Sequence, residues 1–330
     1  MPEPASRPAA AAALPSTRRA LLASPALLLG RRALAWPDRP VRLVVAFPPG
    51  SGTDVLGRVL AAGLQQQLGQ PVVVDNRPGG NGTVGTQSAA MAAPDGDTLL
   101  IISTSAASIN PHTIKRLPYD PVRDFTPVGG IAEEPYLLAV PPDGPDRDLA
   151  GLVERARKNP GSVTQSYGNA AGLVMGSMLA SMAGVSLSPV PYRGGAEALT
   201  DVSVGRIDLN FADVGPALAQ RNGGRVRLVA QTLDRTFPLA PEIPTVSSVV
   251  PGYDVNVWFG LAAPAATPPE VVGRANAALN AALADPDTAG KLAQLGFIPF
   301  RTTPGEFGQY VRRQLAVWGE RVALAKIEAQ

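Results

Sequence analysis

The sequence of 330 residues predicts an α/β protein in which strands and helices alternate along the chain. Three observations support this prediction. The apolar run 41–47 is typical of a buried strand, and it ends abruptly at the turn Pro48-Pro49-Gly50-Ser51-Gly52. From Asp54 to Leu68 the apolar residues repeat at helical spacing, and Gly69 follows where a helix C′ residue is expected. Two further strand patterns, at 71–74 and 99–102, continue the alternation.

The remaining elements follow in the same manner. After the second strand a glycine-rich loop at 76–83 leads into a helix over 84–93, and the third strand runs into the hydroxyl-bearing loop Ser103-Thr104-Ser105. A second block begins with a strand at 136–140. Its helices are expected at 148–158, 172–183 and from 195 to 204, and its strands end at 167, 192, 211 and 232. A long strand at 255–263, helices at 270–284 and 288–295, a strand at 297–300 and a helix at 306–325 complete the chain.

The first 35 residues predict an export signal that is removed from the mature protein. The paired Arg18-Arg19 precede an apolar stretch ending at Leu29, which is too short to span a bilayer. Ala33-Leu34-Ala35 supplies the small-x-small pattern of a signal-peptidase site, and the paired arginines favour the twin-arginine route. The alternative is a disordered leader rich in Ala and Pro. We therefore expect a protein of the periplasm.

Charge and composition exclude several classes of function. Five of the 29 basic and one of the 27 acidic residues fall within 1–35, which leaves 24 and 26 for the remainder. No basic stripe indicates nucleic acid. Cys is absent and His112, interpreted as a loop residue, is the single histidine, so neither thiol chemistry nor a metal site is expected. The turn at Gly50 matches neither a P-loop nor a dinucleotide fingerprint. We predict a protein that is not an enzyme and has no cofactor.

The loops at the ends of the first three strands together predict a binding site. In an open α/β sheet, ligands bind outside the carboxyl ends of the strands, where these loops gather. The turn before Asp54 leaves the first helical N–H groups unpaired, and the helix dipole adds to the attraction for an anion. Two alternatives remain open: the glycines only relieve strain, or the three loops are unrelated turns.

Nine short motifs stand in a specific order along the chain. They are 36–37, 47–54, 75–83, 93–96, 117–121, 124–128, 190–195, 243–246 and 258–264. In this order they resemble the Bug family of tripartite tricarboxylate transporter substrate-binding proteins. The resemblance covers essentially everything after the predicted signal.

The resemblance implies a periplasmic-binding-protein-like fold of type II, the Venus flytrap, with two α/β domains and two crossover strands around a central cleft. Domain 1 would comprise 36–136 plus 253–330, and domain 2 would comprise 137–252. Such receptors capture small carboxylates or related metabolites by hinge closure. The implied partners are a small-molecule ligand and the subunits of a membrane transporter or a sensor domain, and a monomer is expected. The alternative is a sensory or interaction subunit of a membrane signalling system, with or without a ligand.

By the same resemblance, loops of both domains face the ligand. The implied residues of domain 1 are Phe47, Pro49, Gly50, Gly52, Thr53, Asp54, Asn81, Gly82, Thr83, Thr104 and Ser105. Those of domain 2 are Gly168, Asn169, Ala170, Arg193, Gly194 and Asp213. Arg193 alternatively forms a structural ion pair at the surface, and Asp213 alternatively caps the helix that begins at Val214.

The chain departs from the family pattern at 168–175. Ala170 and Ala171 replace hydroxyl donors, and Leu173 stands near the position of a histidine. A buried acceptor that lacks a partner costs about 1–3 kcal/mol, so these losses weaken the binding of a second carboxylate. We therefore expect a less polar ligand, such as a monocarboxylate, an aromatic acid or a neutral amide-like metabolite.

Overall fold

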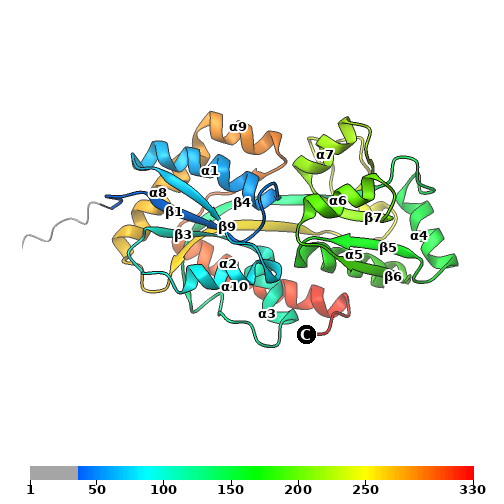
Figure 1. Ribbon diagram of the computed structural model, residues 1–330, viewed down its shortest axis with the longest axis horizontal. Coiled ribbons are helices and arrows are strands. Elements are labelled where there is room, and N and C mark those ends of the chain that lie inside the picture. The colour runs from blue at the N-terminus through cyan, green and yellow to red at the C-terminus, as the bar shows by residue number, and fades with distance from the viewer. Residues whose placement is uncertain (1–35) are drawn as a thin grey trace, which may run out of the picture. The chain divides into compact units, whose positions relative to one another are not determined.

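The strands join into one hydrogen-bonded sheet of ten strands in the part of the chain that the computed structural model describes, residues 36–330 (Figure 1). They are β1 (Val41–Val45), β2 (Val72–Asn76), β3 (Thr98–Ser103), β4 (Phe125–Val140), β5 (Val163–Tyr167), β6 (Leu187–Pro191), β7 (Leu209–Asp213), β8 (Arg227–Gln231), β9 (Asn256–Pro264) and β10 (Ile298–Pro299). The predicted export signal lies outside the described residues.

Ten α-helices accompany these strands within residues 36–330. They are α1 (Gly52–Leu68), α2 (Thr83–Ala90), α3 (Asn110–Thr113), α4 (Leu149–Lys158), α5 (Ala170–Ala183), α6 (Gly195–Ser203), α7 (Val214–Asn222), α8 (Pro269–Ala284), α9 (Pro286–Gln294) and α10 (Pro304–Leu324). Three shorter helical turns are η1 (Gly80–Gly82), η2 (Ser105–Ile109) and η3 (Val246–Ser248). None of the described helices is both long and apolar enough to cross a membrane.

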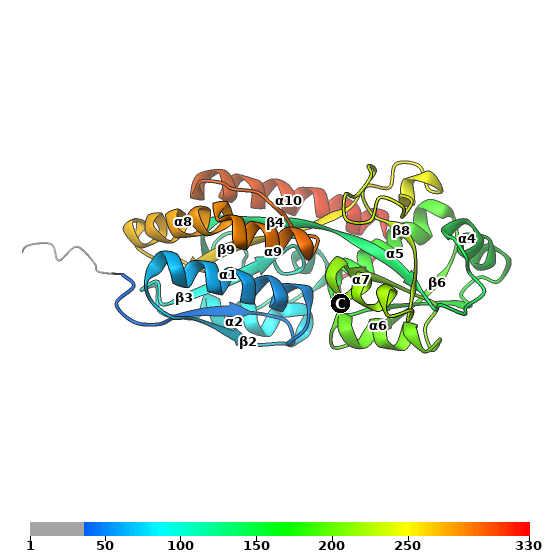
Figure 2. The same cartoon turned by 90° about the horizontal axis from the view of Figure 1, so that it is seen from above.

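The strand order is β2-β1-β3-β9-β4-β7-β5-β6, and β8 and β10 also pair with β4. The strands β1, β2 and β3 are parallel, as are β5, β6 and β7. The long strand β4 changes its partners along its length: Phe125 to Pro135 pair with β9, and Tyr136 to Val140 pair with β7 or β8. Figure 2 shows β4 running between the two groups of parallel strands. The sheet therefore has two parallel parts that β4 connects.

Side chains on both faces of β1 and β3 are buried, as expected for a parallel sheet covered by helices, whereas the edge strand β2 is more exposed. Alternate side chains of β1 point to opposite faces, so Leu43 packs in the same core cluster as Leu60 of α1. Val44 packs instead with Leu100 and Phe307, in a cluster on the other face. Figure 1 shows α1 and α9 on one side of this part of the sheet and α2 and α10 on the other.

Local signals fix the helix ends close to the predicted positions. Ser51 caps α1 by accepting a hydrogen bond from the N–H of Asp54, and Gly69 ends the helix with a φ of 68°. Asp148 caps α4 in the same way. Thr303 and Glu306 form a reciprocal capping box at the start of α10.

The strand predicted at 136–140 is confirmed as the end of β4, but the sequence missed residues 125–135 of the same strand, which include Pro127 and Gly129, residue types that are depleted in strands. Another prediction of local structure is wrong. The predicted loop at Ser103-Thr104-Ser105 instead leads directly into η2 and α3. His112 therefore lies in a short helix rather than a loop, and its Nε2 lies 2.9 Å from the carbonyl oxygen of Leu315 in α10.

Candidate functional site

The turn between β1 and α1 is held by its own side chains. The carboxylate of Asp54 accepts hydrogen bonds from the N–H of Gly50 and from the Nδ2 of Asn76, both at 2.9 Å, and it pairs with Arg58. Burial raises the pKa of Asp54, but the hydrogen bonds from Arg58, Gly50 and Asn76 outweigh it and hold that pKa below its ordinary value. Asp54 therefore fixes the shape of the turn through internal partners.

Most of the first N–H groups of α1 already have partners. The N–H of Gly52 donates to Oδ2 of Asp213 at 3.1 Å, and those of Asp54 and Val55 donate to Ser51. Among the first four amides of the helix, only that of Thr53 has no hydrogen-bond partner within the described residues. The amide surface that the sequence predicted to be free for an anion is thus largely occupied.

Asp213 ends β7 and takes the N-cap position of α7 without capping it. Its side chain makes no capping hydrogen bond, and the N–H of Val214 donates instead to Oε1 of Glu134 at 2.8 Å. The alternative that Asp213 caps the helix starting at Val214 is therefore wrong. Burial raises the pKa of Asp213, and hydrogen bonds from Gly52 and Tyr136 only partly offset this rise.

Glu134 is a second buried acid next to Asp213. Its side chain is fully buried, and its Oε2 has no hydrogen-bond partner. Burial, followed by the charge of Asp213, raises the pKa of Glu134 well above its ordinary value. Within residues 36–330, neither acid forms an ion pair with a Lys, Arg or His side chain.

The loop between β2 and α2 approaches the turn after β1. Asn81 adopts a positive φ of 54°, and its carbonyl oxygen accepts a hydrogen bond from Asn110. Gly82 packs against the ring of Phe47, since a Cβ added there would lie 3.1 Å from the ring. The hydroxyl of Thr83 donates to the carbonyl oxygen of Gly80. These contacts bring the first two glycine-rich loops together around Phe47.

The loops after β5 and β6 face these two. A Cβ added to Gly168 would lie 2.2 Å from the carbonyl carbon of Gly194, so only glycine fits at this approach. A Cβ on Gly194 would lie 3.2 Å from Cγ of Pro48, on the turn after β1. Asn169 caps α5 by accepting from the N–H of Gly172, and its Nδ2 donates to the hydroxyl of Tyr136.

Two spaces lie between these loops, and Phe47 lines both. The larger, about 440 Å³, also contacts Ala46, Pro48, Pro78, Gly79, Gly80, Asn81, Gly82, Gly168, Tyr192 and Arg193. The smaller, about 10 Å³, also contacts Thr53, Ser103, Thr104, Ser105, Tyr136, Asn169, Ala171, Val257 and Phe259. We call them the outer pocket and the inner cavity. The inner cavity is at most large enough for one water molecule.

The structure therefore divides the predicted site residues into three groups. Phe47, Asn81, Gly82, Gly168 and Arg193 line the outer pocket, and Phe47, Thr53, Thr104, Ser105 and Asn169 line the inner cavity. Pro49, Gly50, Gly52, Asp54, Thr83, Ala170, Gly194 and Asp213 line neither space. Sequence reasoning missed the lining residues Tyr136 and Tyr192. Tyr192 lies within the motif 190–195, whereas no local pattern distinguishes Tyr136 from a core residue.

Arg193 is the cation of the outer pocket. Its side chain is exposed, and no acidic side chain of residues 36–330 lies within ion-pair distance of it. The alternative of a structural ion pair is therefore not realised among these residues. Thr104 of the inner cavity, unlike Arg193, already has partners for its polar group. Its buried hydroxyl bonds to both the N–H and the carbonyl oxygen of Trp258 in β9.

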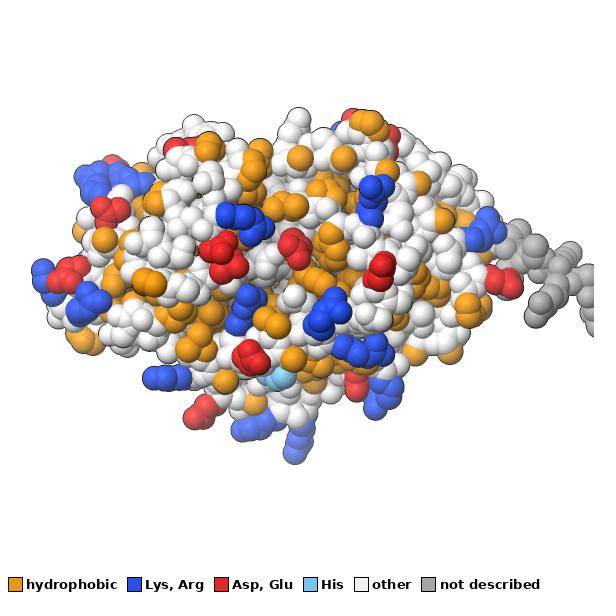
Figure 3. Space-filling view, turned by 180° about the vertical axis from the view of Figure 1, so that it is seen from behind, with side chains coloured by type: hydrophobic (Ala, Val, Ile, Leu, Met, Phe, Trp, Pro, Cys, Tyr) orange, Lys and Arg blue, Asp and Glu red, His pale blue; other side chains and the backbone are white. Residues whose placement is uncertain are grey.

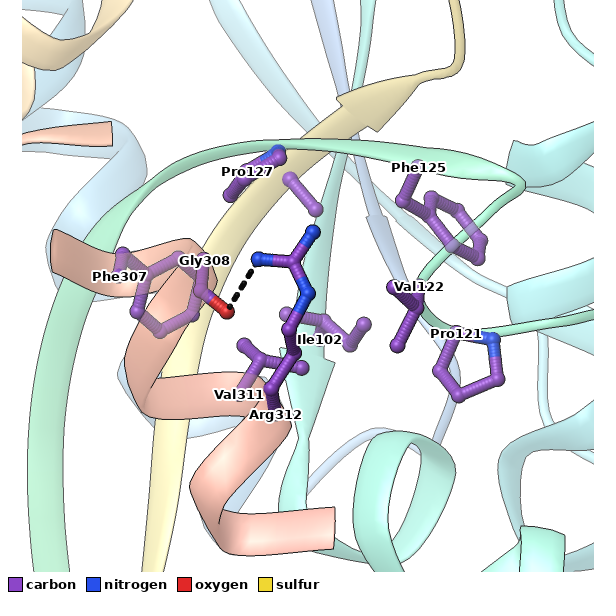
Figure 4. A pocket seen from close by; sticks show the side chains of 10 residues that line it. Ile102, Pro121, Val122, Phe125, Pro127, Phe307, Gly308, Val311 and Arg312 are labelled. Carbon is purple, nitrogen blue, oxygen red and sulfur yellow. Dashed lines mark hydrogen bonds between the residues drawn. The ribbon is translucent and has the colours of Figure 1, made fainter. Parts of the chain in front are cut away.

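A further hollow, between β4, β9 and α10, has a different character. It has a volume of about 30 Å³ and is lined mainly by apolar side chains, such as Phe125 and Phe307 (Figure 4). Arg312 at its edge donates to the carbonyl oxygen of Gly308. The hollow is too small for an organic ligand.

No group of three or more acidic or histidine side chains in residues 36–330 could hold a metal ion. Figure 3 shows basic and acidic side chains interspersed on one face.

The mixed α/β fold, with loops that meet around a pocket, defines the class of periplasmic binding proteins. One solved structure, that of the periplasmic binding protein BugD, matches with a TM-score of 0.85 and 32% identity, covering 89% of this chain and 100% of that one. Residues 56–326 match the family described as the tripartite tricarboxylate transporter family receptor. The chain belongs to this family, which confirms the predicted resemblance, the fold class and the prediction of a receptor rather than an enzyme.

Two more proteins are similar over most of their length. The chain is 36% identical over 323 residues to a UPF0065 protein in the tcbD-tcbE intergenic region of Pseudomonas sp. strain P51, covering 94% of this chain and 96% of the relative. The structure of R. palustris Rpa4515 with adipate matches with a TM-score of 0.87 and 32% identity, covering 89% of this chain and 100% of that one.

Proposed function

We propose that this chain is an extracytoplasmic solute-binding protein that captures a small carboxylate or a related metabolite and passes it to a tripartite tricarboxylate-type transporter. The guanidinium of Arg193 on the wall of the outer pocket, which has no ion-pair partner within residues 36–330, is the observation that carries this proposal. The pocket's volume of about 440 Å³ suits a small metabolite. The complex of a 32% identical structural relative with adipate supports a carboxylate as the ligand.

The outer pocket supplies the ligand carboxylate with a cation and with backbone groups. Each charge-assisted hydrogen bond from Arg193 contributes about 1.5–3 kcal/mol net of water. The glycines at 79, 80 and 82 leave the loop backbone uncovered by side chains, so the ligand can approach it closely. In this proposal the amides at helix N-termini have a smaller role than the sequence predicted, because that of Gly52 is already paired.

Binding would couple to closure of two domains, 36–136 plus 253–330 and 137–252. The change of partners along β4 between Pro135 and Tyr136 supports a boundary at this point. The contacts of Pro48 with Gly194 and of Gly52 with Asp213 join the two proposed domains. Closure around a ligand would exclude water from the pocket, so the affinity would depend on both the contacts and the equilibrium between open and closed forms.

The proposal includes export to the periplasm and removal of the signal within residues 1–35. The membership in a receptor family and the 32% identity to a periplasmic binding protein support this location. The ligand is expected to be a monocarboxylate, an aromatic acid or a neutral amide-like metabolite. The apolar ring of Phe47 between the two spaces supports this expectation.

Isothermal titration of the protein purified from the periplasm tests the proposal. The titrants are a panel of small acids that includes citrate and apolar acids. We expect one of them to bind with a stoichiometry of one per chain and to be recovered chemically unchanged. Native mass spectrometry of the same preparation should show a co-purifying small acid. Failure to bind any acid, or conversion of a bound acid to a product, would contradict the proposed function. Tight binding of citrate, with no binding of apolar acids, would contradict the less polar ligand.

A further inference from the structure

The carboxylate of Asp213 occupies a position at which helix N-termini converge. Its Oδ2 accepts from the N–H of Gly52 at 3.1 Å, at the start of α1. A Cβ added to Gly195, the first residue of α6, would lie 3.5 Å from the same oxygen. Helix N-termini attract anions because their amides are unpaired and the helix dipole is positive there. The protein's own carboxylate thus serves as the anion at this position.

The packing around Asp213 leaves no space for a second anion next to Gly52. A Cβ added to Gly52 would lie 2.7 Å from Cγ of Asp213. Asp213 itself is 9% exposed. A ligand carboxylate could bond to the amide of Gly52 only after displacing that of Asp213.

The surroundings of Asp213 also lack a compensating cation. Oε1 of the neighbouring Glu134 accepts from the N–H of Val214, the residue after Asp213, and the buried Oε2 of Glu134 has no partner among residues 36–330. No cation of residues 36–330 pairs with either acid. Tyr136, which lines the inner cavity, lies opposite Asp213 in the pairing of β4 with β7. A ligand carboxylate in the outer pocket that is directed towards the inner cavity would therefore approach the carboxylate of Asp213, which no cation of residues 36–330 pairs with.

We propose that Asp213 determines the specificity of the site by excluding a second ligand carboxylate. This inference rests on the proposed function of the outer pocket. The two ends of the site differ in charge: Arg193 lines the outer pocket, and Asp213 lies next to Tyr136 and to Gly52, beside the lining of the inner cavity. The ligand class follows from this arrangement: one carboxylate that binds near Arg193, and a neutral or cationic far end.

Titrations with acids of matched length test this inference. The probes are pairs that differ only at the far end: butanoate and succinate, hexanoate and adipate, octanoate and octanedioate. In wild-type protein the monocarboxylate should bind more tightly than its dicarboxylate partner by about tenfold or more, because a second charge approaches the carboxylate of Asp213 in a poorly solvated site. 6-Aminohexanoate, whose far end is cationic, should bind at least as tightly as hexanoate.

The isosteric variant Asp213→Asn removes the charge and keeps an oxygen for the amide of Gly52. It should reduce the preference for the monocarboxylate by about tenfold. The matched control is Glu197→Gln on α6, which makes the same change of charge at an exposed position and should leave the preference unchanged. An unchanged preference in Asp213→Asn, or a preference for dicarboxylates in the wild-type protein, would overturn the inference.

An NMR titration tests the occupancy of the amide without any ligand. The amide resonance of Gly52 should shift with pH as Asp213 titrates, and this shift should be absent in Asp213→Asn. Glu134 and Tyr136 are the other titratable groups next to Asp213. A Gly52 resonance that responds identically in both proteins would overturn the inference. A different outcome would count against the proposed function alone. In that outcome no probe binds either protein, but the Gly52 resonance still shifts with the titration of Asp213.

Discussion

Oδ2 of Asp213 accepts a hydrogen bond of 3.1 Å from the backbone N–H of Gly52, a residue 161 positions earlier in the chain. This bond connects the end of β7 with the start of α1, and it places a buried carboxylate beside the pocket loops. The neighbouring Glu134 accepts from the N–H of Val214, the first residue of α7. The two buried acids therefore stabilise helix N-termini at the junction of the two parts of the sheet.

The variant Glu134→Gln should change how stability depends on pH. The pKa of Glu134 is raised in the folded protein, so the unfolded chain loses its proton at a lower pH than the folded one. The stabilisation from protonated Glu134 is therefore complete below the ordinary Glu pKa and is lost as pH rises towards the raised pKa. Urea unfolding at pH 5.5 and pH 8 should show that the variant gains stability relative to wild type at the higher pH. Parallel pH profiles would contradict this assignment.

The variant Asp54→Asn should destabilise the turn between β1 and α1. It weakens the charge-assisted hydrogen bonds from Gly50 and Asn76, which suggests a loss of about 1.5–3 kcal/mol at pH 7. Because the pKa of Asp54 is lowered in the folded protein, this stabilisation is present above the ordinary Asp pKa and is lost as pH falls through the lowered value.

Urea unfolding at pH 7 and pH 3 measures this effect. The difference between Asp54→Asn and wild type should shrink at the lower pH. Asp287→Asn is the control, since this exposed acid pairs with Lys291 on the surface of α9 and its replacement should cost less than about 1 kcal/mol. Equal losses in the two variants would contradict the role of Asp54 in fixing the turn.

The variant Gly168→Ala should separate the loops after β5 and β6. The added Cβ would lie 2.2 Å from the carbonyl carbon of Gly194, so the backbone must shift, at a cost of about 1–3 kcal/mol. Gly273→Ala is the control, because no atom lies within 4 Å of its added Cβ and alanine favours the helix. Thermal unfolding should show a lower melting temperature for the first variant and an equal or higher one for the second. A wild-type melting temperature in Gly168→Ala would refute the close contact.

The sequence predicted those elements whose signals are local. The helical spacing from Asp54 to Leu68 and the following Gly69 predicted α1, and apolar runs predicted β1 and β3. Residues 125–135 of β4 could not be predicted, because Pro127 and Gly129 oppose a strand and the pairing with β9 and β10 stabilises it.

The same distinction applies to the candidate site. The rule that loops gather at strand ends predicted which segments meet around Phe47. It could not predict that Asp213 would use the amide of Gly52, or that Glu134 would be buried beside it, because both contacts depend on tertiary packing between distant segments. The free state of Arg193 likewise depends on the absence of a nearby acid within residues 36–330, which no local pattern encodes.

The most direct test of the account is the affinity of Arg193→Gln for the carboxylate that the wild-type protein binds, measured by isothermal titration. Loss of the charge-assisted hydrogen bonds, worth about 1.5–3 kcal/mol, should weaken binding by roughly tenfold to a hundredfold. Arg225→Gln, at another exposed arginine, should bind as tightly as wild type. A wild-type dissociation constant in Arg193→Gln would contradict the claim that this guanidinium holds the ligand carboxylate in the outer pocket.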